Sequence, residues 1–288
     1  NTVARDISDR HITSRDLAEG IYRFMIGLGK KVILANQLSE VSDQFLAGGL
    51  QHLTTSGAWV GIIAFTLQIY FDFSGYSDMA IGLGHMLGFS FLENFRYPYA
   101  AGSITEFWRR WHISLSRFFR DYVYIPLGGN RRSRARNLLN LFIVWALTGL
   151  WHGSSWNFLM WGLYWFLFLT LERALGREKP RRASIFSHVY VLLVVLLGWV
   201  LFRFTDVRLG WTVVRGLFGL NGNRAWDFLT LTVLENNLFL LLVSALACTP
   251  LPKRISDLLA RGRLWDGCRK ALWPVALLLP LWANWASR

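Results

Sequence analysis

Six strongly apolar runs alternate with polar, mostly basic segments along this chain. The runs cover residues 57–71, 138–151, 156–171, 188–202, 236–251 and 271–285. A helix needs about 20 apolar residues to cross a bilayer directly, and each run has only 14–16. Irregular backbone at membrane depth survives only where protein or a cavity surrounds it. We therefore expect an all-α, polytopic membrane protein with short, tilted, broken or re-entrant helices.

The segments between the runs carry further expectations. Residues 21–38 are apolar but contain two adjacent lysines, which indicates a membrane helix end with snorkelling lysines or an interfacial helix. We interpret residues 41–56 as a short exposed connection and residues 203–235 as a mixed loop. Small residues let membrane helices approach closely. Four glycines follow the first run, namely Gly75, Gly82, Gly84 and Gly88.

The longest basic segment covers residues 93–137 and holds nine arginines against three acidic residues. Such an excess marks the cytoplasmic side of a membrane. Two shorter basic segments follow, at residues 173–182 and 253–270, and two apolar runs separate each basic segment from the next. Because two crossings return the chain to the side it left, we expect all three basic segments on the cytoplasmic side. The PLGGN sequence at 126–130 predicts a turn. Three- and four-residue spacing predicts one amphipathic surface helix through Trp108, Trp111, His112, Leu115 and Phe119.

Composition supports a membrane protein and argues against a soluble nucleic-acid binder. The chain is 53% hydrophobic with a mean hydropathy of +0.31, and it contains 15 Trp and 21 Phe. Its net charge is +13, which basic cytoplasmic loops explain better than a nucleic-acid partner does. The two cysteines, Cys248 and Cys268, have no metal-ligand spacing with histidine, so we expect neither a disulfide framework nor a metal site.

His152 lies between two apolar runs, flanked by Trp151 and Gly153. Ionisable residues within membrane segments are costly and usually functional. A neutral imidazole in such a place can act as a general base on a hydroxyl that attacks a carbonyl. A histidine held by a backbone carbonyl at a helix end fits the sequence equally well.

His112 stands beside Arg109, Arg110 and Trp111. Its simplest interpretation is an interfacial residue on a basic helix, and its functional one is a group that orients an acyl carbonyl. The arginines fit anionic lipid headgroups or a phosphate-bearing donor such as a coenzyme A thioester. Asp72, at the end of an apolar run, can pair with a basic residue or orient a histidine.

Several stretches, in order over roughly residues 19–205, carry a family resemblance. They are EGIYRFMIGLGKKVILAN, FDFSGYSDMAIGLGHMLGF, ENFRYPY, ITEFWRRWHISLSRFFRDYVYIPLGGNRR, LTGLWHGSSWNFLMWGLYW and GWVLFRF. Together they resemble the membrane-bound O-acyltransferase (MBOAT) family, and within it the bacterial branch that O-acetylates alginate. The resemblance implies a multi-helix bundle around a tunnel, in which an acyl group crosses towards an acceptor hydroxyl.

The resemblance also implies roles for particular residues. The family's essential histidine maps onto His152 in WHG, and a second one onto His112 in RWH. We expect both to be catalytic. The residues expected to bind substrate or donor are Trp108, Arg109, Arg110, Trp151, Asn157 and Asp72. No bound cofactor is implied, and acetyl-CoA or another acyl thioester is the expected donor substrate.

The expected setting is a multi-pass protein of the bacterial inner membrane, in contact with membrane lipid. Its expected partners are an extracytoplasmic acetyltransferase and an exported polysaccharide such as alginate. The alternatives are a transporter or channel, or a family member that acts on a lipid, teichoic acid or protein. Because members of this branch are longer, we expect residues 1–288 to be one MBOAT-type domain without its early helices and extreme C-terminus.

Overall fold

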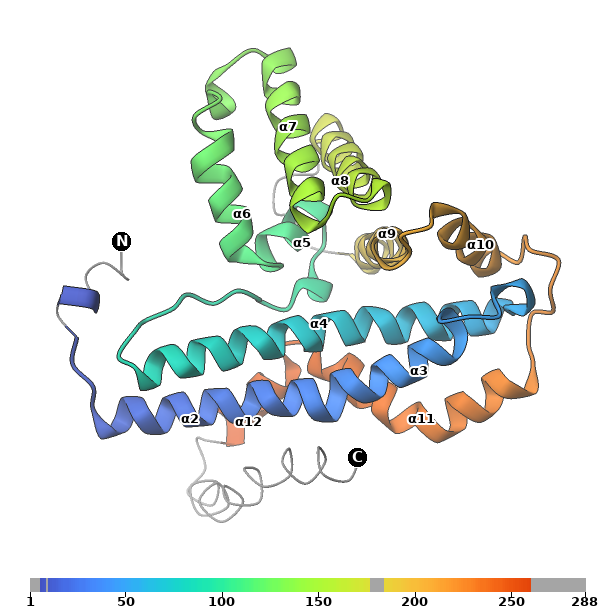
Figure 1. The fold of residues 1–288 in the computed structure, drawn as a ribbon, viewed down its shortest axis with the longest axis horizontal. Helices are drawn as coiled ribbons and strands as arrows, with labels where there is room; N and C mark the ends of the chain where they lie inside the picture. The colour runs from blue at the N-terminus through green and yellow to red at the C-terminus, as the bar shows by residue number, and fades with distance from the viewer. Residues whose placement is uncertain (1–5, 9, 177–183, 260–288) are drawn as a thin grey trace. The chain divides into compact units, whose positions relative to one another are not determined.

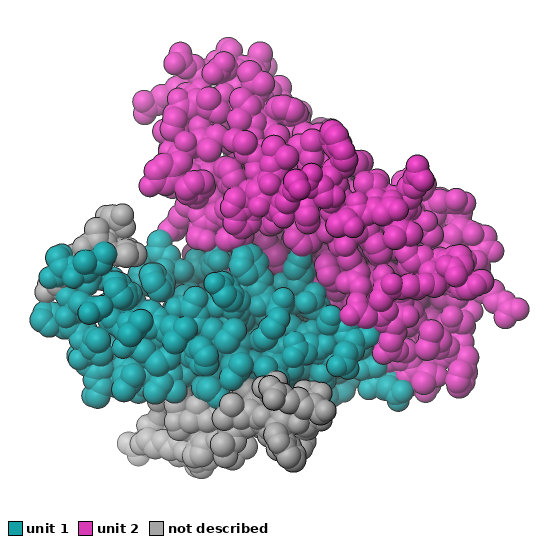
Figure 2. Space-filling view, in the orientation of Figure 1, with its two compact units in different colours: residues 1–41, 67–94, 236–288 teal, residues 42–66, 95–235 magenta. Residues whose placement is uncertain are grey.

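The computed structural model describes residues 6–8, 10–176 and 184–259. Within these ranges the secondary structure is helical, with no strand. The contacts divide the chain into two compact units (Figure 2). Unit 1 takes residues 1–41, 67–94 and 236–288, and unit 2 takes 42–66 and 95–235. The apolar run expected at 271–285 and Cys268 lie outside the described residues.

Unit 1 is built on a close pairing of two helices, α2 (Ser14–Gly29) and the second part of α4 (Thr55–Met86), which run side by side in Figure 1. A Cβ atom added to Gly27 would lie 2.5 Å from the carbonyl oxygen of Gly75, and one added to Gly20 would lie 2.7 Å from that of Gly82. Only glycine permits this approach, so the expectation that the glycine-rich stretch packs closely is confirmed.

Helix α2 begins with a capping box between Thr13 and Asp16. It runs on through a π-helical turn, Lys30–Ala35, into α3 (Asn36–Leu46). Lys30 binds Asp78 at 2.6 Å, and Lys31 forms an ion pair with Asp72. The two lysines therefore lie against carboxylates of α4, which replaces the expectation that they snorkel to a membrane surface.

Unit 2 contains most of the remaining helices. In chain order they are α5 (Ile104–Arg110), α6 (Ile113–Phe119), α7 (Arg134–His152), α8 (Trp156–Ala174), α9 (Ile185–Arg203) and α10 (Val207–Leu217). Helices α7 and α8 form an antiparallel hairpin (Figure 1). Its backbones nearly touch, because a Cβ on Gly162 would lie 2.3 Å from the carbonyl oxygen of Trp145. The break predicted between the two apolar runs at 152–155 is confirmed.

The described residues correct two connections. Residues 41–56 are not an exposed connection, because α3 continues to Leu46 and buries Val41 and Phe45. The segment 203–235 is not wholly a loop, because α10 occupies Val207–Leu217. Both helices place their apolar residues three and four positions apart, which is the pattern of an amphipathic helix. The pattern was missed because both helices are short and their neighbouring residues are polar.

Three described helices are long and apolar enough to cross a membrane: α4, α9 and α11 (Phe228–Ala247). Helices α7 and α8 each have 19 residues, longer than their apolar runs, because their ends extend into polar sequence. The expected side of each basic segment, and the expectation of one domain over 1–288, stay predictions.

Candidate active site

The amphipathic helix expected around His112 is broken at that residue. Helix α5 ends at Arg110 and α6 starts at Ile113. His112 has φ 45° and ψ 56°, in the left-handed region, where among the described non-glycine residues it is joined only by Tyr97. The prediction of one continuous helix was therefore wrong. Side-chain spacing could not signal the break, because the apolar residues on both sides of His112 keep three- and four-residue intervals. A non-glycine residue in the left-handed region is uncommon, and histidine is one of the types that adopt it more often.

A buried carboxylate holds the start of α5. Glu172 on α8 is 1% exposed. It accepts hydrogen bonds from the backbone N–H of Ile104 at 2.6 Å and of Thr105 at 2.9 Å, and from the Thr105 hydroxyl at 2.8 Å. These bonds satisfy donors at the helix N-terminus that have no partner within the helix. Glu172 thus fixes the helix that leads into His112.

A cluster of aromatic rings fills the space between α5, α7, α8 and α9. Trp108 packs edge-on against Trp145 with ring centroids 4.7 Å apart, and against Trp165 at 5.0 Å. Trp111 lies 4.9 Å from Trp199. Such edge-to-face contacts give a rigid apolar core. Several indole N–H groups in it are buried without a hydrogen-bond partner among the described residues, which indicates a site of low polarity.

His152 is the last residue of α7, and aromatic rings surround it. Its ring centroid lies 4.9 Å from that of Trp161 on α8, 5.2 Å from Phe202 on α9 and 4.9 Å from its neighbour Trp151. His152 is outside the three candidate membrane spans. Burial lowers the pKa of its imidazole to about 4. It is therefore neutral near pH 7 and free to accept a proton.

His112 is linked to His152 through Trp151. The rings of His112 and Trp151 have centroids 6.0 Å apart, and Trp151 is 57% exposed. The Nδ1 atom of His112 lies 3.3 Å from the hydroxyl of Ser114. Burial, and to a lesser extent the charge of a protonated His152, together lower the pKa of His112 to about 4. Because the pKa of both imidazoles lies well below 7, both are neutral near pH 7.

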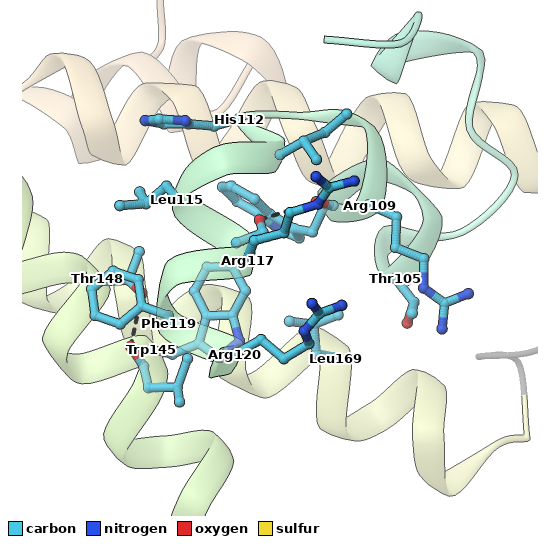
Figure 3. A pocket seen from close by; sticks show the side chains of 14 residues that line it. Thr105, Arg109, His112, Leu115, Arg117, Phe119, Arg120, Trp145, Thr148 and Leu169 are labelled. Carbon is cyan, nitrogen blue, oxygen red and sulfur yellow. Dashed lines mark hydrogen bonds between the residues drawn. The ribbon is translucent and has the colours of Figure 1, made fainter. Parts of the chain in front are cut away.

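A cavity of about 540 Å³ opens beside His112, between α5, α6 and the α7–α8 hairpin. Figure 3 shows the guanidinium groups of Arg109, Arg117 and Arg120 together on one side of it. The opposite side is formed by less polar side chains, including Leu115, Phe119, Trp145 and Thr148. A molecule with an anionic part and an apolar part fits this division.

The structure brings some of the predicted site residues together. His112, Trp108 and Arg109 line the cavity, and Trp151 contacts both histidines. Asn157 is fully buried, and its amide donates to the Leu201 carbonyl at 3.2 Å. The Oδ1 atom of Asn157 has no partner among the described residues.

Two predicted site residues have other contacts. Arg110 forms an ion pair with Glu106 and donates to the Tyr97 carbonyl at 3.4 Å. Asp72 belongs to unit 1 and pairs with Lys31. The described contacts of both are thus structural, and their roles in donor binding stay predictions.

Sequence reasoning missed five residues of this region. They are Arg117, Arg120, Trp161, Glu172 and Phe202. Glu172 could have been found from the sequence, because it is a carboxylate near the end of an apolar run. His152 was selected on the ground that ionisable residues within membrane segments are costly and usually functional, and the same reasoning applies to Glu172. Nothing in the spacing distinguished Arg117 and Arg120 from the other arginines of the basic segment. Among the described residues, no group of three or more His, Cys, Asp or Glu side chains is placed to hold a metal.

Comparison with known proteins adds independent information. In Pseudomonas aeruginosa, a protein named "Probable alginate O-acetylase AlgI" is 50% identical over 202 residues, which are 70% of this chain and 38% of that protein. The "Peptidoglycan O-acetyltransferase" of Helicobacter pylori is 38% identical over 222 residues, 76% of this chain and 42% of that protein. The "Teichoic acid D-alanyltransferase" of Bacillus subtilis is 28% identical over 157 residues, 52% of this chain and 38% of that protein.

These alignments mean that the chain spans about two fifths of the length of the curated relatives it matches. The sequence model of the membrane-bound O-acyltransferase family matches residues 7–181, which include the RWH and WHG motifs and the lining of the cavity. The resemblance seen in the motifs is thereby confirmed, and with it a membrane setting. The chain belongs to the membrane-bound O-acyltransferase family.

Proposed function

We propose that the protein is an O-acyltransferase that moves an acetyl group from a cytoplasmic thioester to a hydroxyl on the other side of the membrane. One arrangement supports this proposal most strongly. His152 is a neutral histidine among aromatic rings, and Trp151 contacts both it and His112, which lines a cavity rich in arginine. Membership of an acyltransferase family supports it and does not favour a transporter or channel.

The donor in this proposal is acetyl-CoA, bound in the cavity of about 540 Å³. Arg109, Arg117 and Arg120 offer planar guanidinium donors suited to the phosphates of coenzyme A. The opposite, less polar side suits the thioester arm. His112, at the rim of α6, orients the acyl carbonyl by a hydrogen bond. Its backbone conformation fixes the direction of the imidazole.

His152 is the general base of the proposed reaction. The acceptor hydroxyl gives its proton to the neutral imidazole as its oxygen attacks the acetyl carbonyl carbon. A new C–O bond forms, the C–S bond of the thioester breaks, and the thiolate leaves with the proton that the imidazole returns. The aromatic rings around His152 reduce the access of water to it and thus limit hydrolysis of the thioester.

The acceptor in this proposal is an exported polysaccharide such as alginate, reached through an extracytoplasmic acetyltransferase partner. The protein would then be a multi-pass protein of the bacterial inner membrane with a tunnel between its two faces. The similarity to a probable alginate O-acetylase and to a peptidoglycan O-acetyltransferase supports O-acetylation of a polysaccharide acceptor. The lower identity to a teichoic acid D-alanyltransferase supports it over D-alanyl transfer.

The test replaces His152 with Gln in cells that lack the native protein. Glutamine keeps the approximate size and polarity but cannot take a proton, so acetyl ester on the exported polysaccharide should fall about a hundredfold or more. His52→Gln is the matched control, because His52 is exposed on a short helix (Leu50–His52) and its loss should leave acetylation unchanged. Normal acetylation with His152→Gln, at equal protein level in the membrane, would refute the proposal.

A further inference from the structure

The last turn of α9 contacts both the candidate active site and two further helices of unit 2. Its residues Leu201, Phe202 and Arg203 belong to the GWVLFRF sequence, which the proposed reaction does not use. The Leu201 carbonyl accepts a hydrogen bond from the Asn157 amide at 3.2 Å. Because Asn157 is fully buried in the first turn of α8, this bond ties the end of α9 to the helix that follows His152.

Phe202 forms part of the aromatic enclosure of His152. The centroids of the two rings are 5.2 Å apart, and their planes are nearly perpendicular at 87°. Phe202 also packs against Phe158 and Trp161 of α8, with ring centroids 5.4 Å apart in both cases. Contacts of this kind depend on the orientation of the rings. A shift of the α9 end would therefore change how the His152 imidazole is enclosed and oriented.

Arg203 holds this end of α9 against α3 and α4. Its guanidinium donates to the Asp43 carboxylate at 2.5 Å, and its Cζ atom lies 4.8 Å from the centroid of the Phe65 ring. The Arg203 side chain is 17% exposed, and Phe65 is buried. A guanidinium that is largely withdrawn from water gains more from a carboxylate and an aromatic face than an exposed one does. A positive charge in the last turn of a helix also complements the helix dipole.

We propose that Arg203 is a positioning residue for His152 and acts through Phe202. Its contacts with Asp43 and Phe65 fix the last turn of α9, and the fixed Phe202 ring keeps the His152 imidazole in one orientation. Such support matters because a displacement of about 1 Å at reacting groups can lower a rate about a hundredfold. The inference rests on the proposed role of His152 as the general base.

The kinetic test compares R203Q and R203K in membrane vesicles that contain the full-length protein. R203Q loses the charge, so kcat per folded protein should fall about tenfold. The KM for acetyl-CoA should change less than about twofold, because Arg203 is not among the described residues that line the cavity beside His112. Lysine keeps the charge but cannot stack a planar group on Phe65, so R203K should have a kcat between those of R203Q and the wild type. R208Q is the matched control, since Arg208 is exposed near the start of α10, and it should change neither constant.

A double variant tests whether Arg203 acts through Phe202. Phe202→Leu removes the ring that contacts His152 and should itself lower kcat. If the effect of Arg203 passes through that ring, adding R203Q to F202L should lower kcat by less than about twofold more, because substitutions in one chain of contacts are not additive. A further loss as large as that of R203Q alone would mean that Arg203 acts by another route, and would overturn the proposal.

A second readout does not depend on acetyl transfer. Diethyl pyrocarbonate modifies neutral imidazole nitrogens, and mass spectrometry of the digested protein gives the rate of modification at each histidine. In detergent, His152 should react several-fold faster in R203Q than in the wild type, because a displaced Phe202 ring leaves the imidazole more open. The exposed His52 is the internal reference and should react at the same rate in both proteins.

The two readouts separate the ways in which the proposal can fail. A lower kcat together with faster modification of His152 supports it. A wild-type kcat in R203Q, or wild-type modification of His152, would overturn it, and so would an R203K variant as slow as R203Q. Less folded protein with unchanged kinetic constants would limit Arg203 to supporting the fold, which also contradicts the proposal. Acetylation that survives His152→Gln would refute the general base instead, while the modification rate still reports whether Arg203 controls the enclosure of His152.

Discussion

In unit 1, Asp78 is 5% exposed and binds both Lys30 and Arg23, at 2.6 Å and 2.5 Å. In unit 2, His152 lies among the rings of Trp161 and Phe202 instead. Both are ionisable groups among apolar helices, which are costly there unless something compensates. Pairing with opposite charges keeps a carboxylate in place as part of the packing. Aromatic enclosure keeps a histidine neutral, as the proposed general base has to be.

The comparison predicts opposite outcomes for similar substitutions. Asp78→Asn removes the carboxylate that Lys30 and Arg23 share, while Arg23 keeps its pair with Glu93 at 2.7 Å. Because both cations are partly exposed, losing these charge-assisted hydrogen bonds costs about 1–3 kcal/mol. The free energy of unfolding should fall by that amount, which denaturation in detergent can measure. His152→Gln should instead leave stability nearly unchanged while activity is lost.

A matched control for Asp78→Asn is Glu19→Gln. Glu19 forms an exposed pair with Arg15 at 2.7 Å, and exposed pairs contribute little. If Asp78→Asn unfolds no more easily than Glu19→Gln, the ion pairs of unit 1 are not structural. The distinction between the two units would then be wrong.

Glu172 sharpens the comparison, since it is a buried carboxylate in unit 2 that pairs with N–H and O–H donors rather than with a cation. Glu172→Gln replaces one acceptor oxygen by an NH₂ group, which cannot accept from a backbone N–H. One donor at the start of α5 then loses its partner, at a cost of about 1–3 kcal/mol. Because α5 leads into His112, we also expect a raised KM for acetyl-CoA.

The control for this positioning role is Glu106→Gln, in the same helix but partly exposed, where the carboxylate pairs with Arg110 and accepts from the Gly102 backbone N–H at 2.8 Å. It should lower stability much less. If Glu172→Gln destabilises the protein while the KM and kcat of the remaining folded enzyme match the wild type, Glu172 supports the fold but does not position His112.

The sequence was sufficient for the helical class, the family and the α7–α8 break, because apolar runs and ordered motifs are local features of the chain. It was insufficient for the break at His112, whose neighbours keep perfect helical spacing although the backbone turns there. It also could not show that Lys30 and Lys31 bind carboxylates some 40 to 50 residues away. Long-range pairs and strained residues are decided by tertiary packing, which periodicity does not contain.

Substitutions in the cavity beside His112 test whether it is the donor site of the proposed reaction. R117Q/R120Q removes two of its guanidinium groups and should raise the KM for acetyl-CoA about tenfold, with kcat changed little, because in the proposed reaction these groups bind the donor without touching the reacting bond. Initial rates on inverted membrane vesicles measure both constants. R131Q/R136Q, with the same charge loss outside the cavity, is the control. Equal effects of the two pairs would assign the role to general surface charge.

The smallest effect expected is in the pH dependence of stability. Burial holds the pKa of both His112 and His152 at about 4, below the ordinary value of about 6.5 that the unfolded chain retains. As the pH falls from about 6.5 to about 4, the unfolded chain takes up protons before the folded protein does. Acidification across this window therefore lowers the free energy of unfolding, and the full contribution of the two histidines to stability is present above about pH 6.5.

Thermal unfolding in detergent between about pH 7 and about pH 4.5 measures this slope. The double variant H112Q/H152Q removes both groups, so its unfolding temperature should fall less on acidification than that of the wild type. Acidic partners in unit 1 remain in both proteins, so their contribution cancels in the comparison. Equal slopes would mean that the two histidines are as accessible to protons in the folded protein as in the unfolded chain. Aromatic enclosure would then not be what separates His152 from the paired charges of unit 1.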